Sequence, residues 1–280
     1  MTWVARTYRS TSASFPGAEE ALDKIEFLLG RCILKLKDKV TIVTGSSRGI
    51  GKAIALAYAK EGAKVVVAAR TEAEGGKLPG TIHKTVEEIR ASGGQAIAVR
   101  CDVTNEEEVQ AMVNKTMEEF GRIDVLFNNA GILFISNIVD TPLRRWSLIL
   151  NVNLTGPFLC SKAVLPHMME QRSGSIINMT SIEASNRKPG IVPYATTKAA
   201  LERFTINLAE EVRDYNIAVN ALAPGLIKTE AAVLLQFTDD WTGWQKPEVV
   251  GPPAIFLALQ DAKSFTGRVV HTPEFRITWP

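Results

Sequence analysis

The sequence VTIVTGSSRGIG, residues 40–51, decides the fold because it leads from a strand pattern directly into a glycine-rich turn. Val40–Val43 is a short run of apolar and β-branched residues, which is typical of a buried strand. The next residues, Lys52–Ala57, have the character of a helix. A strand, a glycine-rich turn and a helix in this order form the context that a dinucleotide-binding fingerprint requires.

The glycines of this turn are suited to a bound pyrophosphate. They let the backbone turn tightly and approach the ligand, and the free N–H groups at the helix start favour its negative charge. Their spacing, G-x-x-x-G-x-G, fits the common G-x-G-x-x-G fingerprint only loosely, so a plain glycine-rich turn stays open as the alternative. As a nucleotide site, the turn would supply Gly45, Ser47, Arg48, Gly49, Ile50 and Gly51.

Strand-like and helix-like segments alternate from Lys39 onward. The predicted strands are Val40–Val43, Lys64–Ala69, Gln95–Val99, Val125–Phe127, Ser175–Met179, Ile217–Ala221 and Arg268–Val270. Segments between them have the length and periodicity of helices, among them Glu106–Phe120, Leu143–Met169 and Pro193–Val212. This alternation predicts an α/β fold, a single doubly wound Rossmann-type domain in which helices cover both faces of a parallel sheet of about seven strands.

The composition narrows the function classes. The formal net charge is +2, and the absence of a localised basic run predicts no nucleic-acid partner. Apolar residues make up 46% of the chain, yet we find no apolar stretch of the ~18 residues that a membrane span needs. The three cysteines and three histidines are scattered, so we expect no metal site, no disulfide and a reducing compartment.

Tyr194 and Lys198 stand four residues apart, one helical turn, with Ser181 thirteen residues upstream. A lysine on the same helix face as a tyrosine favours the phenolate and lowers the pKa of the tyrosine toward the range of a general acid or base. A serine hydroxyl beside them would hydrogen-bond the oxygen that gains or loses the proton. The trio predicts proton transfer to a carbonyl or from an alcohol.

Several motifs occur in one order: T-G-x-x-x-G-x-G at Thr44–Gly51, N-N-A-G at Asn128–Gly131, then Ser181, Tyr194 and Lys198. N-V-N-L at Asn151–Leu154 and P-G-x-x-x-T at Pro224–Thr229 add to them. Over roughly residues 36–270 the chain resembles the classical short-chain dehydrogenase/reductase family. The resemblance implies an enzyme that uses NAD(P) to interconvert a carbonyl and an alcohol.

The resemblance also implies roles for these residues. Tyr194 would be the acid or base, Ser181 would stabilise the substrate oxygen, Lys198 would bind the nicotinamide ribose, and Asn153 would hold a water that connects Lys198 to solvent. Further cofactor contacts are implied for Asp102, Val103, Asn129, Ala130, Gly131, Pro224, Gly225, Ile227 and Thr229.

The strand that ends at Ala69-Arg70 bears on the choice of cofactor. A carboxylate at this position would receive the ribose hydroxyls of NAD(H) and disfavour a 2′-phosphate, but the strand has none. Arg70 is placed to pair with a phosphate, and Arg48 would add a second positive charge. We therefore predict NADP(H) in preference to NAD(H), with two merely solvated arginines as the alternative.

Two other segments depart from the family pattern. The loop at residues 71–80 is longer than usual and either folds over the adenosine end of the cofactor or is plain length variation. Its K-L-P-G-T-I wording, Lys77–Ile82, resembles hydroxysteroid-dehydrogenase-like and citronellol-dehydrogenase-like members. The tail at His271–Arg276 lacks the usual acidic-Gly-Gly stretch, a region that often makes subunit contacts in the family. The resemblance therefore implies either a homodimer through the helices of Asn153 and Tyr194 or a homotetramer, and the unusual tail argues against a standard tetramer.

The substrate is predicted to be a small, hydrophobic carbonyl compound or alcohol. The loop 230–247 carries five large apolar residues that either form a wall of the substrate site or pack on the core or a partner subunit, namely Leu234, Leu235, Phe237, Trp241 and Trp244. A 3-oxoacyl thioester reductase is the alternative enzyme. A dinucleotide-binding regulator without turnover is the alternative from another class.

Residues 1–35 precede the predicted domain at 36–280. Met1–Ala18 contains Arg6 and Arg9 and no acidic residue, which is faintly like an organellar transit peptide. Glu19–Leu36 has apolar residues at helical spacing, so a flexible extension and a short amphipathic helix are both open. We expect a cytoplasmic protein, with organellar targeting as the alternative.

Overall fold

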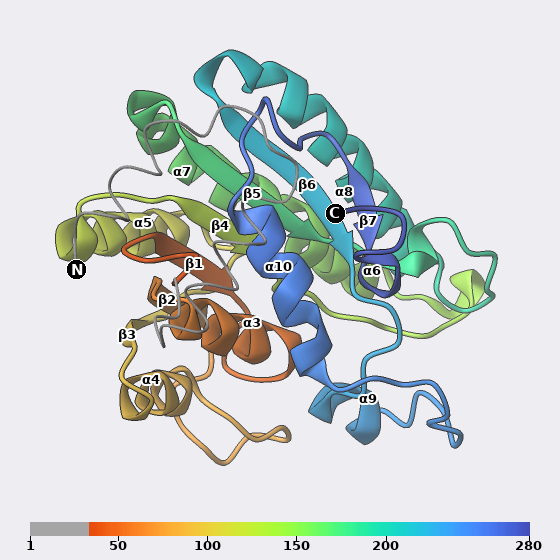
Figure 1. Ribbon diagram of the computed structural model, residues 1–280. Helices are drawn as coiled ribbons and strands as arrows, with labels where there is room; N and C mark the ends of the chain where they lie inside the picture. Colours follow the sequence, from red (N-terminus) through yellow and green to blue (C-terminus); the bar gives the residue numbers. More distant parts are fainter. Residues whose placement is uncertain (1–33) are drawn as a thin grey trace, which may run out of the picture. The chain divides into compact units, whose positions relative to one another are not determined.

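Runs of β-branched and apolar residues build one parallel sheet. The computed structural model describes residues 34–280, so the expectations for residues 1–33 lie outside the described part. The sheet has seven strands in the order β3-β2-β1-β4-β5-β6-β7, which confirms the predicted doubly wound fold (Figure 1). The strands are β1 Val40–Thr44, β2 Lys64–Ala69, β3 Gln95–Arg100, β4 Val125–Asn128, β5 Gly174–Met179, β6 Ile217–Ala223 and β7 Val269–His271.

Helices connect successive strands and cover both faces of the sheet. Apolar residues of α3, α4 and α10 share one core cluster, and those of α5, α7 and α8 share the other. The longer helices are α3 Gly49–Lys60, α4 Ile82–Ala91, α5 Glu106–Phe120, α6 Leu143–Leu150, α7 Gly156–Gln171, α8 Val192–Glu211 and α10 Gly251–Ala258, with the short α9 at Glu230–Leu234.

The period of two along each strand explains why there are two cores. Ile42 and Val43 are adjacent in β1 and both fully buried, but Ile42 packs with the α5 side and Val43 with the α3 side. A strand buried on both faces is apolar at most positions, and the polar residues within these strands, such as Thr41, Asn178 and Asn220, are buried as well.

Capping residues set the limits of α5, whose bounds agree with the sequence prediction. The side chain of Asn105 accepts a hydrogen bond of 2.9 Å from the N–H of Glu108, which caps the first turn. Gly121 ends the helix in a left-handed conformation, φ 74°, which costs glycine little.

The segment predicted as one helix, Leu143–Met169, is interrupted. A π-helical turn at Asn151–Thr155 separates α6 from α7. Leu143–Gln171 as a whole is long and apolar enough to cross a membrane by length and composition, which the sequence prediction overlooked. Half of its most apolar window is buried within the protein, as in a core helix, and Val164 and Met168 have no exposed surface.

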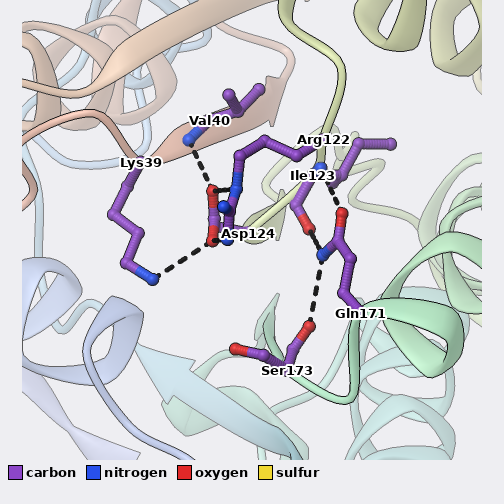
Figure 2. A network of polar contacts seen from close by, with 7 residues as sticks. All are labelled: Lys39, Val40, Arg122, Ile123, Asp124, Gln171 and Ser173. Carbon is purple, nitrogen blue, oxygen red and sulfur yellow. Dashed lines mark hydrogen bonds and ion pairs between the residues drawn. The ribbon is translucent and has the colours of Figure 1, made fainter.

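A network of polar contacts joins the amino ends of β1 and β4 (Figure 2). Asp124, just before β4, accepts hydrogen bonds from the N–H of Val40 at 2.9 Å, from Lys39 at 3.1 Å and from two nitrogens of Arg122. Beside it, Gln171 at the end of α7 pairs with the backbone of Ile123. The opposite, carboxyl ends of β1 and β4 flank the point where the strand order reverses, which is where open α/β sheets bind ligands.

Candidate active site

The glycine turn lies at the carboxyl end of β1. Gly45 and Gly49 have φ of 66° and 56°, which side-chain-bearing residues rarely adopt. A Cβ on Gly51 would overlap the backbone of Gly45 and the side chain of Asn129. The turn is therefore compact because its glycines allow it, and it leads into the first N–H groups of α3, which no side chain caps.

Hydrogen bonds tie this turn to the segment after β4. The hydroxyl of Thr44 accepts from the N–H groups of Asn129 and Ala130 at 3.0 and 3.1 Å. The amide of Asn129 in turn donates to the carbonyl of Thr44 at 2.9 Å. These hydrogen bonds thus hold the two predicted nucleotide-binding motifs together at the point where the strand order reverses.

Arg70 and Asp102 face each other beyond the ends of β2 and β3. Their closest charged atoms are 3.5 Å apart, and 59% of the Arg70 side chain is exposed. Burial would raise the pKa of Asp102, but hydrogen bonds from Thr104 and the charge of Arg70 lower this pKa below its usual value. Asp102 is thus an anion that holds the Arg70 guanidinium at the rim of the site.

Arg48 lines the cavity and also makes hydrogen bonds within the protein. Its guanidinium donates to the carbonyl oxygens of Pro79 at 2.7 Å, Gly80 at 2.9 Å and Leu78 at 3.5 Å. A further hydrogen bond joins it to the hydroxyl of Thr71 at 3.3 Å. Arg48 therefore holds the loop 71–80 against the glycine turn, and the Arg48 donors in these bonds are not free for a phosphate.

The long loop returns to the nucleotide end of the site. Gly80, with φ 95°, lies so near the turn that a Cβ there would be 2.6 Å from the carbonyl oxygen of Ser47. Thr71 and Leu78 line the same cavity as the glycine turn. Of the two interpretations of this loop, the structure favours the one in which it covers the adenosine end.

Helix α8 and the segment after β5 bring the catalytic candidates together. Tyr194 lies in the first turn of α8, and its phenol and the hydroxyl of Ser181 line the same cavity. Burial raises the pKa of Tyr194, the Ser181 hydrogen bond lowers it, the charge of Glu183 raises it, and the net effect is a raised pKa. The expected lowering of this pKa is therefore wrong for the protein alone, because burial outweighs the other influences.

Lys198 lies one turn further along α8 and has only 3% of its surface exposed. Its Nζ donates to the carbonyl oxygen of Met179 at 2.7 Å and lies 5.6 Å from the centre of the Tyr194 ring. Burial lowers the pKa of Lys198 to about 8, against the opposing effect of Glu202. Glu202 itself accepts a hydrogen bond of 2.8 Å from Thr180.

The side chain of Asn153 supports the site from behind. It has no exposed surface, and it exchanges two hydrogen bonds with the backbone of Ile132, at 2.8 Å and 2.9 Å. Its amide also donates to the hydroxyl of Thr197. The side chain thus joins the π-turn, the segment after Gly131 and α8, and is not exposed to a ligand.

One cavity of about 590 Å³ unites the predicted site. Every predicted catalytic and cofactor-binding residue except Asn153 lines it, from Gly45 to Thr229. The same cavity is lined by residues that sequence analysis missed, including Leu133, Glu183 and Lys188. The only indication of these residues in the sequence is that Leu133 closely follows Gly131, and that Glu183 and Lys188 closely follow Ser181.

The loop 230–247 contributes part of its apolar residues to this cavity. Leu235, Phe237 and Trp244 line it, whereas Trp241 packs against Trp244 with ring centres 4.9 Å apart. A hydrogen bond of 2.8 Å from Gln245 to Leu226 closes the loop at its base. The predicted apolar wall is therefore present, made by three of the five residues.

The arrangement can bind a dinucleotide along the sheet edge and bring a carbonyl group to Ser181 and Tyr194. The family model described as short chain dehydrogenase matches residues 39–238. The chain belongs to this family. It is thus an oxidoreductase with an NAD(P)-binding Rossmann fold.

Curated relatives of this short-chain dehydrogenase differ in their names. The 3-oxoacyl-(acyl-carrier-protein) reductase of Synechocystis sp. is 41% identical over 236 residues, covering 82% of this chain and 93% of the relative. Hydroxysteroid dehydrogenase-like protein 2 of Bos taurus is 37% identical over 84% of this chain, which spans only 57% of that relative's length. Glucose 1-dehydrogenase 2 of Bacillus subtilis is 36% identical, covering 83% and 92%.

Solved structures agree on the fold. A structure from Beutenbergia cavernae, described as an NAD(P)-dependent gluconate 5-dehydrogenase with bound NADP, has a TM-score of 0.77 and 31% identity, covering 86% of this chain and 97% of its own. A gluconate 5-dehydrogenase from Burkholderia cenocepacia in complex with NADP and tartrate has a TM-score of 0.74 and 29% identity, covering 85% and 95%.

Proposed function

We propose that this short-chain dehydrogenase interconverts a carbonyl and an alcohol on a small, largely hydrophobic substrate with NADP(H) as the preferred cofactor. One observation carries the proposal: the glycine turn and the Ser181, Tyr194 and Lys198 side chains line the same cavity. Nucleotide-binding and proton-transferring groups that share one cavity of this size fit a reaction between a bound dinucleotide and a small molecule.

The residues of the cavity fit a dinucleotide. Gly45 and Gly51 pack closely against neighbouring protein atoms because they lack a Cβ, which keeps the turn compact. A pyrophosphate would then bind beside this turn at the uncapped start of α3. The nicotinamide, when bound, supplies or accepts the hydride. Gly131, Thr229 and Lys198 would hold its end of the cofactor, and all three line the cavity.

In the reducing direction, Tyr194 would donate its proton to the substrate oxygen. Its raised pKa keeps the phenol protonated at neutral pH, which is the state a proton donor needs. The hydroxyl of Ser181, which lines the same cavity as the phenol, would donate to the same substrate oxygen and stabilise its developing charge. In the oxidising direction the same groups would act in reverse, with Tyr194 as the base.

The preference for NADP(H) rests on Arg70. Its exposed guanidinium lies at the rim of the site, the end of β2 carries no carboxylate, and Asp102 is already paired with it. The two solved relatives described with NADP are consistent with this preference. Arg48 adds less support, because its Nε and Nη2 donate to the loop 71–80.

A second candidate function is the reduction of a 3-oxoacyl thioester. The 41% identical relative from Synechocystis favours it, as does Lys188, an exposed cation on the cavity lining that would attract an acidic acyl carrier. A regulator without turnover is the other alternative, and the intact set of Ser181, Tyr194 and Lys198 weighs against it.

We also propose a homodimer through the helical segments that carry Asn153 and Tyr194, or a homotetramer, and a cytoplasmic location. Phe158 on α7 and Val192 on α8 are 46% and 43% exposed, which is consistent with a covered helix face in an oligomer.

The test is the oxidation of NADPH or NADH, followed by absorbance, with medium-chain aldehydes, cyclic ketones and an acetoacetyl thioester as substrates. NADPH-favoured turnover of aldehydes or ketones would support the proposal. Preference for the thioester would favour the second candidate. Tight NADPH binding without reduction of any of them would favour the regulator.

A further inference from the structure

Glu183 is a carboxylate on the cavity wall that the proposed chemistry does not use. It lies in the short 3₁₀ turn Ile182–Ala184 directly after Ser181, and its N–H donates to the Ser181 hydroxyl at 3.2 Å. Glu183 lines the same cavity as Tyr194. Within the described residues, its Oε2 is buried and has no hydrogen-bond partner.

A buried carboxylate oxygen without a partner is costly. An unmade hydrogen bond on a buried polar atom costs about 1–3 kcal/mol, and more on a charged one. The buried Oε2 of the half-buried Glu183 is therefore unlike the oxygens of Asp124, a buried carboxylate, each of which accepts two hydrogen bonds. A ligand that donates a hydrogen bond to Glu183 would remove this cost.

The carboxylate lies near the reacting oxygen. It shares a single turn with Ser181, both residues line the cavity with Tyr194, and the charge of Glu183 raises the pKa of the Tyr194 phenol. The substrate would place its carbonyl at Tyr194 and a second group at Glu183. That second group must therefore be close to the reacting carbon.

The chemistry of Glu183 and its surroundings narrows the class of that group. A carboxylate only accepts hydrogen bonds, so the group must be a donor, which leaves a hydroxyl or an ammonium. The cation of Lys188 lines the same cavity and opposes an ammonium. Leu133, Phe237 and Trp244 provide apolar surface for the rest of the carbon skeleton.

We propose that Glu183 is a specificity-determining residue that accepts a hydrogen bond from a hydroxyl group beside the reacting carbon, so that the substrates are hydroxy ketones and vicinal diols with an apolar skeleton. This rests on the proposed function and refines its hydrophobic substrate. A site built to bond a substrate hydroxyl discriminates strongly against the analogue that lacks it.

The test compares 2-hydroxycyclohexanone with cyclohexanone, which differ by one hydroxyl. The wild-type kcat/KM should favour the hydroxy ketone by more than about tenfold, one charged hydrogen bond's contribution. In Glu183→Ala this ratio should fall to about one, and in Glu183→Gln it should be intermediate because the amide keeps an acceptor. Glu230→Gln is the matched control, since this carboxylate lines the cavity but is exposed, and it should keep the wild-type ratio.

A binding measurement separates this inference from the proposed function. Calorimetry of trans-1,2-cyclohexanediol and cyclohexanol with the enzyme–NADP⁺ complex should show tighter diol binding that Glu183→Ala abolishes, whether or not either compound turns over. Turnover of both ketones with a wild-type ratio near one, or a ratio that Glu183→Ala leaves unchanged, would overturn the role of Glu183. Diol binding that depends on Glu183 without any turnover would support it and contradict the proposed function instead.

Discussion

The Nζ of Lys198 lies 2.7 Å from the carbonyl oxygen of Met179, the last residue of β5. This bond fixes α8 to the strand that leads to Ser181, so the lysine's first role in the structure is to join the two elements that carry the catalytic candidates. The cation is deeply buried, and burial lowers its pKa to about 8. Its charge state is therefore sensitive to pH in the working range of an enzyme.

The first prediction concerns Glu202, whose charge opposes the lowering of the Lys198 pKa. Glu202→Gln removes this charge but keeps a partner for Thr180. The Lys198 pKa should then fall below about 8. Because neutral Lys198 should bind the nicotinamide ribose more weakly, we expect NADPH affinity to fall as the pH rises, and this fall should begin at a lower pH in the variant. NADPH titrations across a pH series, followed by fluorescence, measure this. An unchanged pH profile would show that Glu202 does not act on Lys198.

The second prediction concerns Arg48 and the loop 71–80. Arg48→Ala removes the hydrogen bonds to Pro79 and Gly80, so amide hydrogen exchange of this loop should accelerate. The KM for NADPH and for NADH should rise by similar factors of roughly tenfold, because a covering loop is lost and not a phosphate contact. Arg90→Ala is the matched control, since Arg90 also donates to a backbone carbonyl, that of Ala96, but does not line the active-site cavity. A selective loss of NADPH in Arg48→Ala would instead make Arg48 a phosphate reader.

The third prediction concerns Arg70. Arg70→Ala should lower the preference for NADPH over NADH by roughly tenfold to a hundredfold, because it removes a charged hydrogen bond to the 2′-phosphate. It also leaves Asp102 without its cationic partner, and this carboxylate would repel the phosphate. The ratio of kcat/KM for the two cofactors measures the effect. If the ratio does not change, Arg70 is merely solvated.

The fourth prediction concerns stability. Asp124→Asn should lower the free energy of unfolding by about 1–3 kcal/mol, since it weakens the charged hydrogen bonds from Arg122 and Lys39. Burial would raise the pKa of Asp124, but these partners and the N–H of Val40 lower it below its usual value. Its contribution should thus be present above about pH 4 and be lost as the pH falls through the lowered pKa. Urea unfolding of both proteins across this range checks the sign, and a difference that grows on acidification would contradict it.

The elements that sequence analysis predicted well have local signals. The limits of α5 agree because its cap Asn105 and its terminating Gly121 are both visible in the sequence. The π-turn at Asn151–Thr155 was missed because a single wider turn leaves the apolar periodicity on either side unchanged. The predicted strands agree within a residue or two because each contains several apolar or β-branched residues in succession.

The side-chain partners depend on contacts between distant segments, and there sequence analysis succeeded less well. Arg48 donates a hydrogen bond to Pro79, which is 31 residues away in the sequence. No local pattern indicates this contact, so the sequence predicted only a phosphate partner for Arg48. The pKa of Tyr194 was predicted from its neighbour Lys198, but burial, which depends on the whole fold, dominates. Asn153 was predicted to be in the site from its motif, and the structure adds that its buried side chain bonds Ile132 and Thr197 and does not line the cavity.

The most direct test of the central claim, that Tyr194 transfers the proton, is the NADPH-dependent reduction of 2-hydroxycyclohexanone or of the best ketone or aldehyde of the panel by Tyr194→Phe. Loss of the acid should lower kcat by ~10²–10⁴-fold, while NADPH binding and the melting temperature stay close to those of the wild type. Tyr215→Phe, which changes a tyrosine away from the cavity lining, should retain activity. A Tyr194→Phe enzyme that keeps most of its wild-type kcat would contradict the assignment of Tyr194 as the proton donor.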